Sequence, residues 1–329
     1  MKNRIYRTIL VIGTLFLYSH YSLAECAQNP QNNLRSTASG KTITVQYDNI
    51  SAVGTVLDTQ YVQAFSSNYN FADVATGKIA CGGYQDLYYV NGWAANASKI
   101  AATGIAGIGI RINYNTFGSG SYIPITSANA GSGSSWTMPP SGWNIQIVKT
   151  GTITSSGTLR SGEIAYITQG NSTTGTRFIG NRLSLPTNYR INVVSCSLKN
   201  SKNTYDINLG DWYDTQFKNI GDFQGTVNIP ITLSCQTGTN IKYTVTSDTV
   251  DNAANGRLGL SGANKATGIA VQLLNNAGTP IQLNTKLVQQ NSVPANDYIF
   301  GWKARYIKTA AIVTPGTANA NATVNIRYE

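Results

Sequence analysis

Carboxylates are the first side chains to consider, because a pair of them can act as acid and base in the cleavage of a glycosidic bond. The acidic residues in the first half of the chain are Glu25, Asp48, Asp58, Asp73, Asp86 and Glu163. Their spacing predicts no such pair. The single histidine, His20, lies in a segment that we expect to be removed on export, which excludes a Ser-His-Asp or Cys-His nucleophile. We therefore predict no enzyme, and a secreted carbohydrate-active enzyme is the weakest alternative.

Four cysteines stay in the exported chain: Cys26, Cys81, Cys196 and Cys235. An even number of cysteines in an exported protein favours disulfides, for which three connectivities are possible. We predict the sequential pairing, Cys26 with Cys81 and Cys196 with Cys235, which places one bridge in each half. A metal site is the alternative, but the chain has no CxxC spacing and its exported part has no histidine. We expect neither a metal nor a cofactor.

Arg111 ends the segment GIAGIGIR, whose glycines, Gly104, Gly107 and Gly109, have a spacing similar to that of a phosphate-binding loop. No strand-glycine-helix context surrounds the series, so we predict a glycine-rich turn that leads into a strand. A lone arginine in an apolar strand either points to solvent or lines a shallow site, where its guanidinium can bind hydroxyls or carboxylates.

Aromatic residues gather after Cys81, at Tyr84, Tyr88, Tyr89 and Trp93. Such rings can stack on the faces of sugars. In a β domain they more often form core or cross-strand pairs, which is the interpretation we prefer.

The N-terminus has the pattern of an export signal. Three basic residues precede the apolar run 9–18, and a small-x-small cleavage site ends at Ala24. We predict that residues 1–24 form the signal peptide. The run is too short to span a bilayer and no later segment approaches ~20 uninterrupted apolar residues, so we expect no membrane anchor.

The formal net charge is +10, and without the three basic residues of the signal it is +7. Lys and Arg are scattered singly and form no basic run, so we expect no nucleic-acid partner. A cationic surface favours acidic polymers of a matrix or a cell surface.

Short strands must position these side chains. Charged residues make up 12% of the chain against roughly 25% in an average soluble protein. Alternating or strand-forming runs are separated by Gly, Asn, Ser and Pro, and no segment keeps a helical period beyond about two turns. The fold class is therefore all-β. The clearest strands of the first half are 42–47, 86–90, 108–114, 144–148 and 163–168, and the longest irregular segment is 127–142.

A proline and a polar turn within 185–196 mark a domain boundary, which predicts domains at 25–194 and 195–329. In the second domain, residues 227–235 alternate as a strand. Pro230 within it requires a sheet edge or a bulge, because proline donates no backbone hydrogen bond.

The last fourteen residues alternate between apolar and polar positions and begin at Gly316. They resemble the C-terminus of chaperone-usher pilus subunits, which carry a glycine at that place and a penultimate tyrosine, here Tyr328. The motifs SCSLKN, IPITLSC, TGIAVQLLNNAGTPIQLN and DYIFGWKARYIK extend this resemblance over the whole second domain. From these motifs we also expect a strand, a turn at 275–278 and a second strand within 268–284, and one long strand at 297–308.

The resemblance implies an incomplete immunoglobulin-like sandwich that lacks its last strand. A periplasmic chaperone and then an adjacent pilus subunit would fill the open groove, and assembly would pass through an outer-membrane usher. The residues that it assigns to the groove are Gly316, Val324, Ile326, Tyr328 and Glu329.

The first domain is similar to the type 3 fimbrial adhesin in the stretches SAVGTVLDTQ, SKIAATGIAGIGIRI and WNIQIVKTGTITSSGTLRSGEIAY. A whole domain in place of a donated strand implies a subunit at the fimbrium tip. The resemblance implies an immunoglobulin-like, lectin-like domain that binds a host glycan or matrix protein and supports biofilm formation. A structural cap or initiator subunit without a receptor is the alternative. By match of position, the binding residues are Val56, Thr59, Ile100, Arg111 and Val148; Ile100 replaces a smaller apolar residue.

Overall fold

A computed structural model describes residues 27–28, 31–70, 72–73, 84–117, 121–128, 137–170 and 177–329. Strands dominate these residues, and no described helix has the length and apolar character needed to cross a membrane. The helical elements in this part of the chain are the 3₁₀ turns η1 (Asn115–Phe117), η2 (Lys199–Ser201) and η3 (Asp214–Gln216). The predicted all-β fold class is confirmed. The predicted signal, 1–24, lies outside the described residues.

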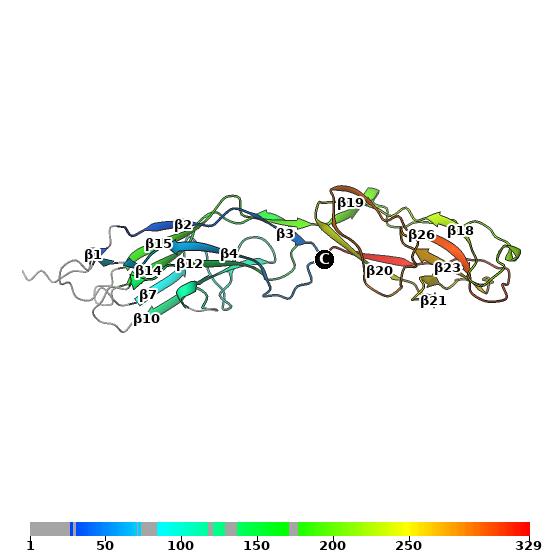
Figure 1. Ribbon diagram of the computed structural model, residues 1–329, viewed down its shortest axis with the longest axis horizontal. Coiled ribbons are helices and arrows are strands. Elements are labelled where there is room, and N and C mark those ends of the chain that lie inside the picture. Colours follow the sequence, from blue (N-terminus) through cyan, green and yellow to red (C-terminus); the bar gives the residue numbers. More distant parts are fainter. Residues whose placement is uncertain are drawn as a thin grey trace, which may run out of the picture.

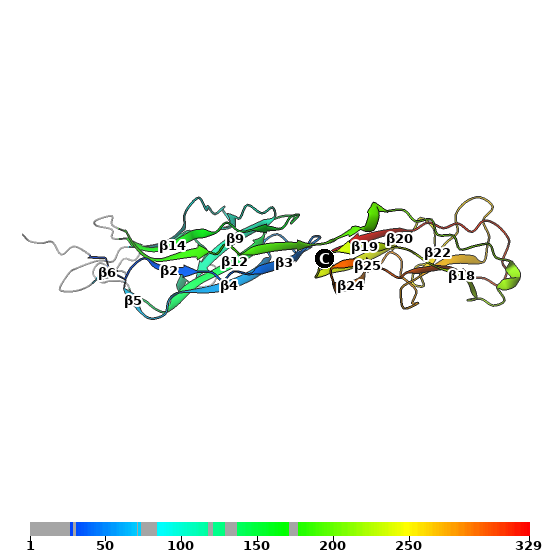
Figure 2. The ribbon, with the colours of Figure 1, turned by 90° about the horizontal axis from the view of Figure 1, so that it is seen from above.

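Buried apolar side chains form two separate clusters, one drawn from Ala38 to Val193 and the other from Cys196 to Ala304. Figures 1 and 2 show the two units lying end to end along the long axis of the molecule. We call the described residues up to 194 the N-terminal sandwich and those from 195 onwards the C-terminal sandwich. The boundary predicted between 25–194 and 195–329 falls between the two clusters.

The N-terminal sandwich has two main sheets, which bury Ile110 and Ile145 of one and Leu87 and Ile167 of the other in a common core. The first sheet has the order β4 (Val56–Phe65), β12 (Ser141–Lys149), β9 (Ile108–Tyr114) and β8 (Ala101–Ala102). The second has the order β10 (Ile125–Ala128), β7 (Tyr84–Tyr89), β14 (Gly162–Gly170), β15 (Arg177–Leu185) and β2 (Leu34–Thr37). Smaller sheets join β13 (Gly157–Thr158), β16 (Arg190–Val194) and β3 (Thr42–Gln46), then β1 (Ala27–Gln28) with β6 (Ala72–Asp73), and β11 (Thr137–Met138) with β5 (Tyr69–Asn70).

The five strands predicted for this sandwich correspond to β3, β7, β9, β12 and β14. The prediction that residues 127–142 form one irregular segment is partly wrong. Its first two residues belong to β10, residues 137–138 form β11, and its last two begin β12; residues 129–136 lie outside the described residues. Pairing with β7, β5 and β4 satisfies these backbone groups despite the Ser, Gly and Pro content.

The C-terminal sandwich has three sheets in the described residues. The first has the order β17 (Cys196–Leu198), β19 (Thr232–Cys235) and β25 (Asn296–Ile299). The second has the order β18 (Phe223–Asn228), β26 (Lys303–Lys308), β23 (Ile269–Leu274), β22 (Arg257–Leu258) and β21 (Val250–Asn252). The third has the order β24 (Leu287–Val293), β20 (Thr239–Thr246) and β27 (Thr323–Arg327). Cys196 lies opposite Cys235 in the pairing of β17 with β19, and the predicted bridge between them is confirmed. The predicted Cys26–Cys81 bridge lies outside the described residues.

Two strands predicted as continuous are each divided between two sheets. Residues 227–235 break between β18 and β19, with Pro230 in the gap, and residues 297–308 break between β25 and β26, where Gly301 has φ +70°. The breaks are adjacent, since the Ile229 amide donates to the Trp302 carbonyl at 2.8 Å. Alternating burial continues through the first break, so the apolar pattern alone did not predict the change of sheet.

The prediction of a second strand after the turn at 275–278 is also wrong. The turn itself forms, with the Gly278 amide donating to the Asn275 carbonyl at 2.9 Å. The residues that follow contribute isolated bridges, Leu274 with Pro280 and Val245 with Leu283. Pro280 donates no backbone hydrogen bond, which prevents a regular ladder here.

Candidate functional site

The five residues predicted to bind a receptor lie on one face of the β4-β12-β9-β8 sheet. Gln146 of β12 pairs with Thr59 on one side and with Arg111 on the other, and Val148 pairs with Val56 and Gly109. Side chains alternate across a sheet, and the core holds Ile145 and Ile147 from β12. Gln146, Val148 and their partners therefore occupy the outer face.

A bulge in β4 places Val56 and Thr59 on the same face. They are three positions apart in the chain, so a regular strand would point them to opposite sides. The register shifts between Ile147 and Val148 of β12, and the extra residue in β4 restores the alignment. Leu57, between them, packs against the core.

Ile100 closes one end of this face by packing over Gly109. A Cβ atom at Gly109 would lie 2.3 Å from Ile100 Cγ2 and 2.8 Å from Thr150 Cγ2, so glycine is required by close packing. Gly104 and Gly107 have φ of +85° and +76°, in the turn that precedes β9. The glycine series therefore forms the predicted turn, and Gly109 also allows the close packing of Ile100; the series has no helix beside it to form a phosphate site.

A hollow of about 680 Å³ runs beside β8 and is lined partly by Ile100, Gly109 and Thr150. Val148 lies next to it on the sheet, fully buried although it does not belong to the hydrophobic core. Val56 and Thr59 are exposed. The face therefore has an apolar part at Ile100 and the buried Val148, an exposed valine at Val56, and a polar end at Thr59 and Arg111.

Arg111 supplies the charge of the polar end. Its Nε donates to Gln146 Oε1 at 2.7 Å, and its guanidinium lies 4.3 Å from the centre of the Tyr122 ring. These contacts fix the guanidinium while leaving donors for an acceptor on a ligand. No group of three His, Cys, Asp or Glu side chains able to hold a metal occurs among the described residues.

Gln146 and Tyr122 are the residues of this face that sequence reasoning missed. Gln146 stands two residues before Val148 in a strand whose alternation was recognised, so it could have been found. Tyr122 reaches the face through an isolated bridge with Asn113, and no local pattern indicates that contact.

The second site predicted from the sequence is the edge of β27. This strand pairs with β20 on one side and stands at the end of its sheet order. Val324, Ile326 and Tyr328 are partly buried against the core, whereas Asn325 and Arg327 are exposed. Burial raises the pKa of Tyr328 to about 12.

Glu329 and Gly316 are the other two residues predicted for the groove, and in the chain they come after and before β27. The Glu329 side chain is buried, and Lys286 Nζ and Lys242 Nζ bind it at 2.8 Å and 3.4 Å. The hydrogen bond from Lys286 is the main cause that lowers the pKa of Glu329. Gly316 packs against residues 264–266, where a Cβ atom would lie 2.4 Å from the Ala266 amide nitrogen.

Two family models match different parts of the chain. Residues 188–329 match the family model of fimbrial proteins, and residues 40–184 match the MrkD-like receptor binding domain. A fimbrial subunit type 1 of Salmonella typhimurium is 30% identical over 142 residues, which are 41% of this chain and 76% of that protein. The chain belongs to the fimbrial protein family. Its fimbrial region contains the Cys196–Cys235 bridge and β27.

Proteins similar to this fimbrial protein also include adhesins. A fimbria adhesin protein of Klebsiella pneumoniae is 25% identical over 250 residues, 72% of this chain and 74% of that protein. Among solved structures, the receptor binding domain of the Klebsiella pneumoniae adhesin MrkD1P has 26% identity and a TM-score of 0.41, covering 53% of this chain and 98% of that one. The CupB6 tip adhesin of Pseudomonas aeruginosa has 16% identity and a TM-score of 0.36, covering 89% and 94%.

The receptor-binding match, 40–184, contains all five predicted binding residues. The chain therefore joins a region that matches a receptor binding domain to a region that matches fimbrial proteins. The relatives are fimbrial and adhesin proteins and indicate no catalytic family.

Proposed function

We propose that this protein is the tip adhesin of a chaperone-usher fimbrium, exported through the periplasm and displayed on the cell surface. It attaches the bacterium to a host glycan or an extracellular-matrix protein, and so supports biofilm formation. The observation that carries the proposal is the shared outer face of Val56, Thr59, Arg111 and Val148, within the region that matches a receptor binding domain.

The face suits a ligand with both apolar and acceptor groups. Ile100 in the hollow and the exposed Val56 offer apolar contact, while Arg111 offers guanidinium donors held by Gln146 and Tyr122. Hydroxyl or carboxylate oxygens are the acceptors that such a guanidinium binds.

Assembly is proposed to use strand donation. Residues 203–209 show alternating burial, with Tyr205, Ile207 and Leu209 turned to the core, yet these described residues make no backbone–backbone hydrogen bond. β27 packs on the same core and presents an unpaired edge within the described sheets. A donated strand between them would pair both edges and cover the apolar side chains, first from the chaperone and then from the adjacent subunit.

A binding screen tests the receptor role. The full chain, displayed on fimbriated cells, is applied to arrays of glycans and matrix proteins, with Arg111→Ala as the variant. Selective binding that the variant weakens supports the adhesin. Fimbriae that assemble normally but bind no component of either array would instead indicate a structural cap or initiator subunit.

A further inference from the structure

The outer face of the first sheet continues along β12 beyond Arg111, away from the hollow beside β8. Asn144 of β12 pairs with Tyr61 of β4 on one side and with Asn113 of β9 on the other. It stands two residues before Gln146, whose side chain lies on the outer face. Because side chains alternate across a sheet, Asn144 and its partners lie on that face too. The face therefore extends beyond the residues predicted from the sequence.

Tyr61 places an aromatic ring at the far end of this extension. A Cβ atom at Gly142 of β12 would lie 2.7 Å from both Cζ and Oη of Tyr61. The ring thus reaches across β12 and occupies the space that a side chain at position 142 would fill, which is a use of glycine where another group approaches the strand closely. Tyr61 is nevertheless 51% exposed. The ring is therefore seated against the sheet and open to a ligand.

Two side-chain amides lie between Tyr61 and Arg111. Asn144 Nδ2 donates to Asn113 Oδ1 at 3.1 Å, and Gln146 Oε1 accepts from Arg111 Nε at 2.7 Å. Both amides are partly exposed, and these bonds hold them in place. A side-chain amide has one acceptor oxygen and two N–H donors. Asn144 therefore keeps its oxygen and one N–H for a ligand, and Gln146 keeps its amide nitrogen.

Arg111, stacked on Tyr122, forms the other end of the row. We call Tyr61, Asn144, Gln146 and Arg111, together with Tyr122, the β12 strip. Gly142 beneath the Tyr61 ring and Gln146 beside Arg111 are four positions apart, which is roughly 13 Å along an extended strand. A single sugar ring is shorter than that. A ligand that contacts both ends of the strip must therefore have more than one ring.

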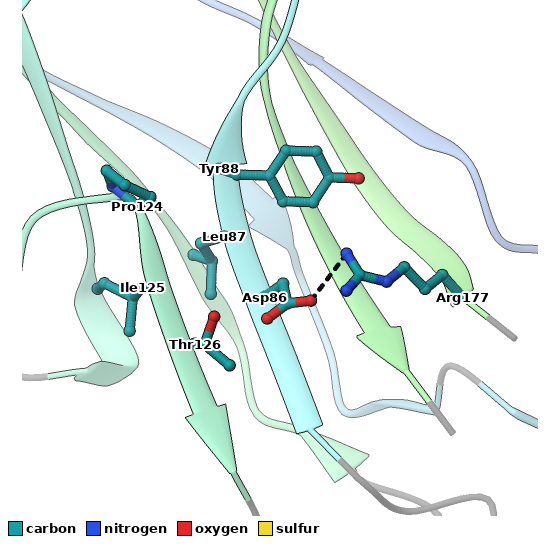
Figure 3. A pocket seen from close by; sticks show the side chains of 7 residues that line it. All are labelled: Asp86, Leu87, Tyr88, Pro124, Ile125, Thr126 and Arg177. Carbon is teal, nitrogen blue, oxygen red and sulfur yellow. Dashed lines mark ion pairs between the residues drawn. The ribbon is translucent and has the colours of Figure 1, made fainter. Parts of the chain in front are cut away.

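The outer face of the second large sheet differs, because its charged side chains bind each other. Figure 3 shows the Arg177 guanidinium directed at the Asp86 carboxylate, and the two groups are 3.0 Å apart. Glu163 is likewise bound by Arg35 and by Arg182. These groups are used within the protein, whereas the amides of the β12 strip retain hydrogen-bonding capacity.

A saccharide fits the order of side chains in the β12 strip. A sugar unit carries apolar C–H groups on its faces, which an aromatic ring can cover, and hydroxyls on its edge, which amides and a guanidinium can bind. A protein ligand is held mainly by an apolar core at the centre of its interface. The centre of the β12 strip is instead formed by the amides of Asn144 and Gln146, which favours the saccharide.

We propose that the β12 strip binds a saccharide of at least two sugar units. One unit lies on the Tyr61 ring beside Asn144, and the next is bonded by Gln146 and Arg111. The proposal rests on the adhesin function proposed above and deepens it, because it selects a saccharide rather than a matrix protein as the ligand of this face. Tyr61 is then the residue that makes the site prefer an oligosaccharide to a monosaccharide.

The test is saturation-transfer difference NMR on purified fimbriae that carry the full chain. The probes are cellobiose, lactose, maltose and chitobiose, each compared with the methyl glycosides of its own sugar units. At least one disaccharide should receive saturation and bind about tenfold more tightly than its units. Tyr61→Ala should weaken binding of that disaccharide about tenfold, since it removes the stacking ring, and Tyr61→Phe should keep the binding.

Tyr47→Ala is the matched control, because Tyr47 is a 42% exposed tyrosine of the same sandwich outside the β12 strip. Loss of binding in Tyr61→Ala, with binding kept in Tyr61→Phe and Tyr47→Ala, supports the proposal. Absence of saturation on all four disaccharides, equal affinity for a disaccharide and its units, or equal binding by the wild type and Tyr61→Ala overturns it. A matrix protein whose binding is weakened by Arg111→Ala but not by Tyr61→Ala would overturn the saccharide and keep the adhesin function. Fimbriae that bind neither saccharide nor matrix protein would overturn both.

Discussion

Asp48 and Tyr328 exchange two hydrogen bonds across the junction between the sandwiches. The Asp48 amide donates to the Tyr328 carbonyl at 2.8 Å, and the Tyr328 amide donates to Asp48 Oδ2 at 2.8 Å. Gln46 makes a similar pair with the carbonyl of Gly238 at 2.9 Å and the amide of Asn240 at 2.8 Å. The N-terminal sandwich is thus hydrogen-bonded both to the end of β27 and to the start of β20 with its preceding turn. These bonds fix the orientation of the two units.

Asp48→Ala is expected to loosen this junction. The substitution removes the acceptor of the Tyr328 amide and the ion pair with Arg327 at 3.4 Å, which together should lower the unfolding free energy by about 1–3 kcal/mol. Small-angle scattering should show a broader distribution of the distance between the sandwiches. Asp251→Ala, which breaks an ion pair with Arg257 away from the junction, is the control. Identical scattering from the two variants would contradict a rigid junction.

Arg111→Ala is expected to weaken receptor binding at a small cost in stability. The variant loses one hydrogen bond to Gln146 and the stacking on Tyr122, which together contribute about 1–2 kcal/mol. Chemical denaturation gives the stability, and binding to the receptor identified by the array gives the function. Arg190→Ala, on β16, should leave binding unchanged. Receptor binding equal in Arg111→Ala and the wild type would remove Arg111 from the site.

Tyr328→Asp is expected to abolish the complex with the periplasmic chaperone. A charged side chain at this partly buried position would disrupt the apolar row of Val324, Ile326 and Tyr328, on which the register of an added strand depends. Residues added after Glu329 should act in the same way. Co-purification with the chaperone measures the effect, with Tyr213→Asp at a 77% exposed position as the control. Full recovery of the Tyr328→Asp complex would argue against assembly by strand donation.

Glu329 should stabilise the fold at neutral pH but not in acid. Its folded pKa is lowered from 4.5, chiefly by the hydrogen bond from Lys286. A lowered pKa contributes stability that is present above the unfolded value and is lost as the pH falls through the folded value. The difference in unfolding free energy between the wild type and Glu329→Gln should therefore be largest near pH 7 and shrink below pH 4.5. A difference that is independent of pH would contradict the ion pairs with Lys242 and Lys286.

Loss of the Cys196–Cys235 bridge should destabilise the C-terminal sandwich. The cysteines are 39 residues apart, and closing a loop of that length contributes about 4 kcal/mol on the chain-entropy estimate. The Cys196→Ala/Cys235→Ala variant, compared with the wild type by denaturation, gives the value.

Peptide mapping without reductant also tests the predicted Cys26–Cys81 bridge, and a peptide linking Cys81 to Cys196 would contradict both pairings.

Period-two alternation predicted most strands because one face of each strand must be apolar wherever a sheet covers a core. It predicted β9 to the residue and placed Val324 and Ile326 on the buried side of β27. It failed where the chain changes sheets, because burial alternates through Pro230 while the pairing partner changes from β26 to β17 and β25.

Contacts between distant segments were beyond any local pattern. Resemblance to a family indicated five candidate binding residues, and the strand pairing then placed four of them, Val56, Thr59, Arg111 and Val148, on one face. The stacking of Tyr122 on Arg111 depends on how the chain returns to β9, and the approach of Arg177 to Asp86 depends on the pairing of β7, β14 and β15. The spacing of these residues in the chain indicates neither contact.

The bridge at the start of β17 determines how the molecule carries mechanical tension. A pull on the N-terminal sandwich along the long axis enters the C-terminal sandwich at Cys196, directly after the connecting Ser195. The disulfide passes this force covalently to Cys235 at the end of β19, a strand paired on both sides by β17 and β25. A short edge strand such as β17 would otherwise peel off one hydrogen bond at a time. We therefore expect a pull along the long axis to be shared by the interior of this sheet.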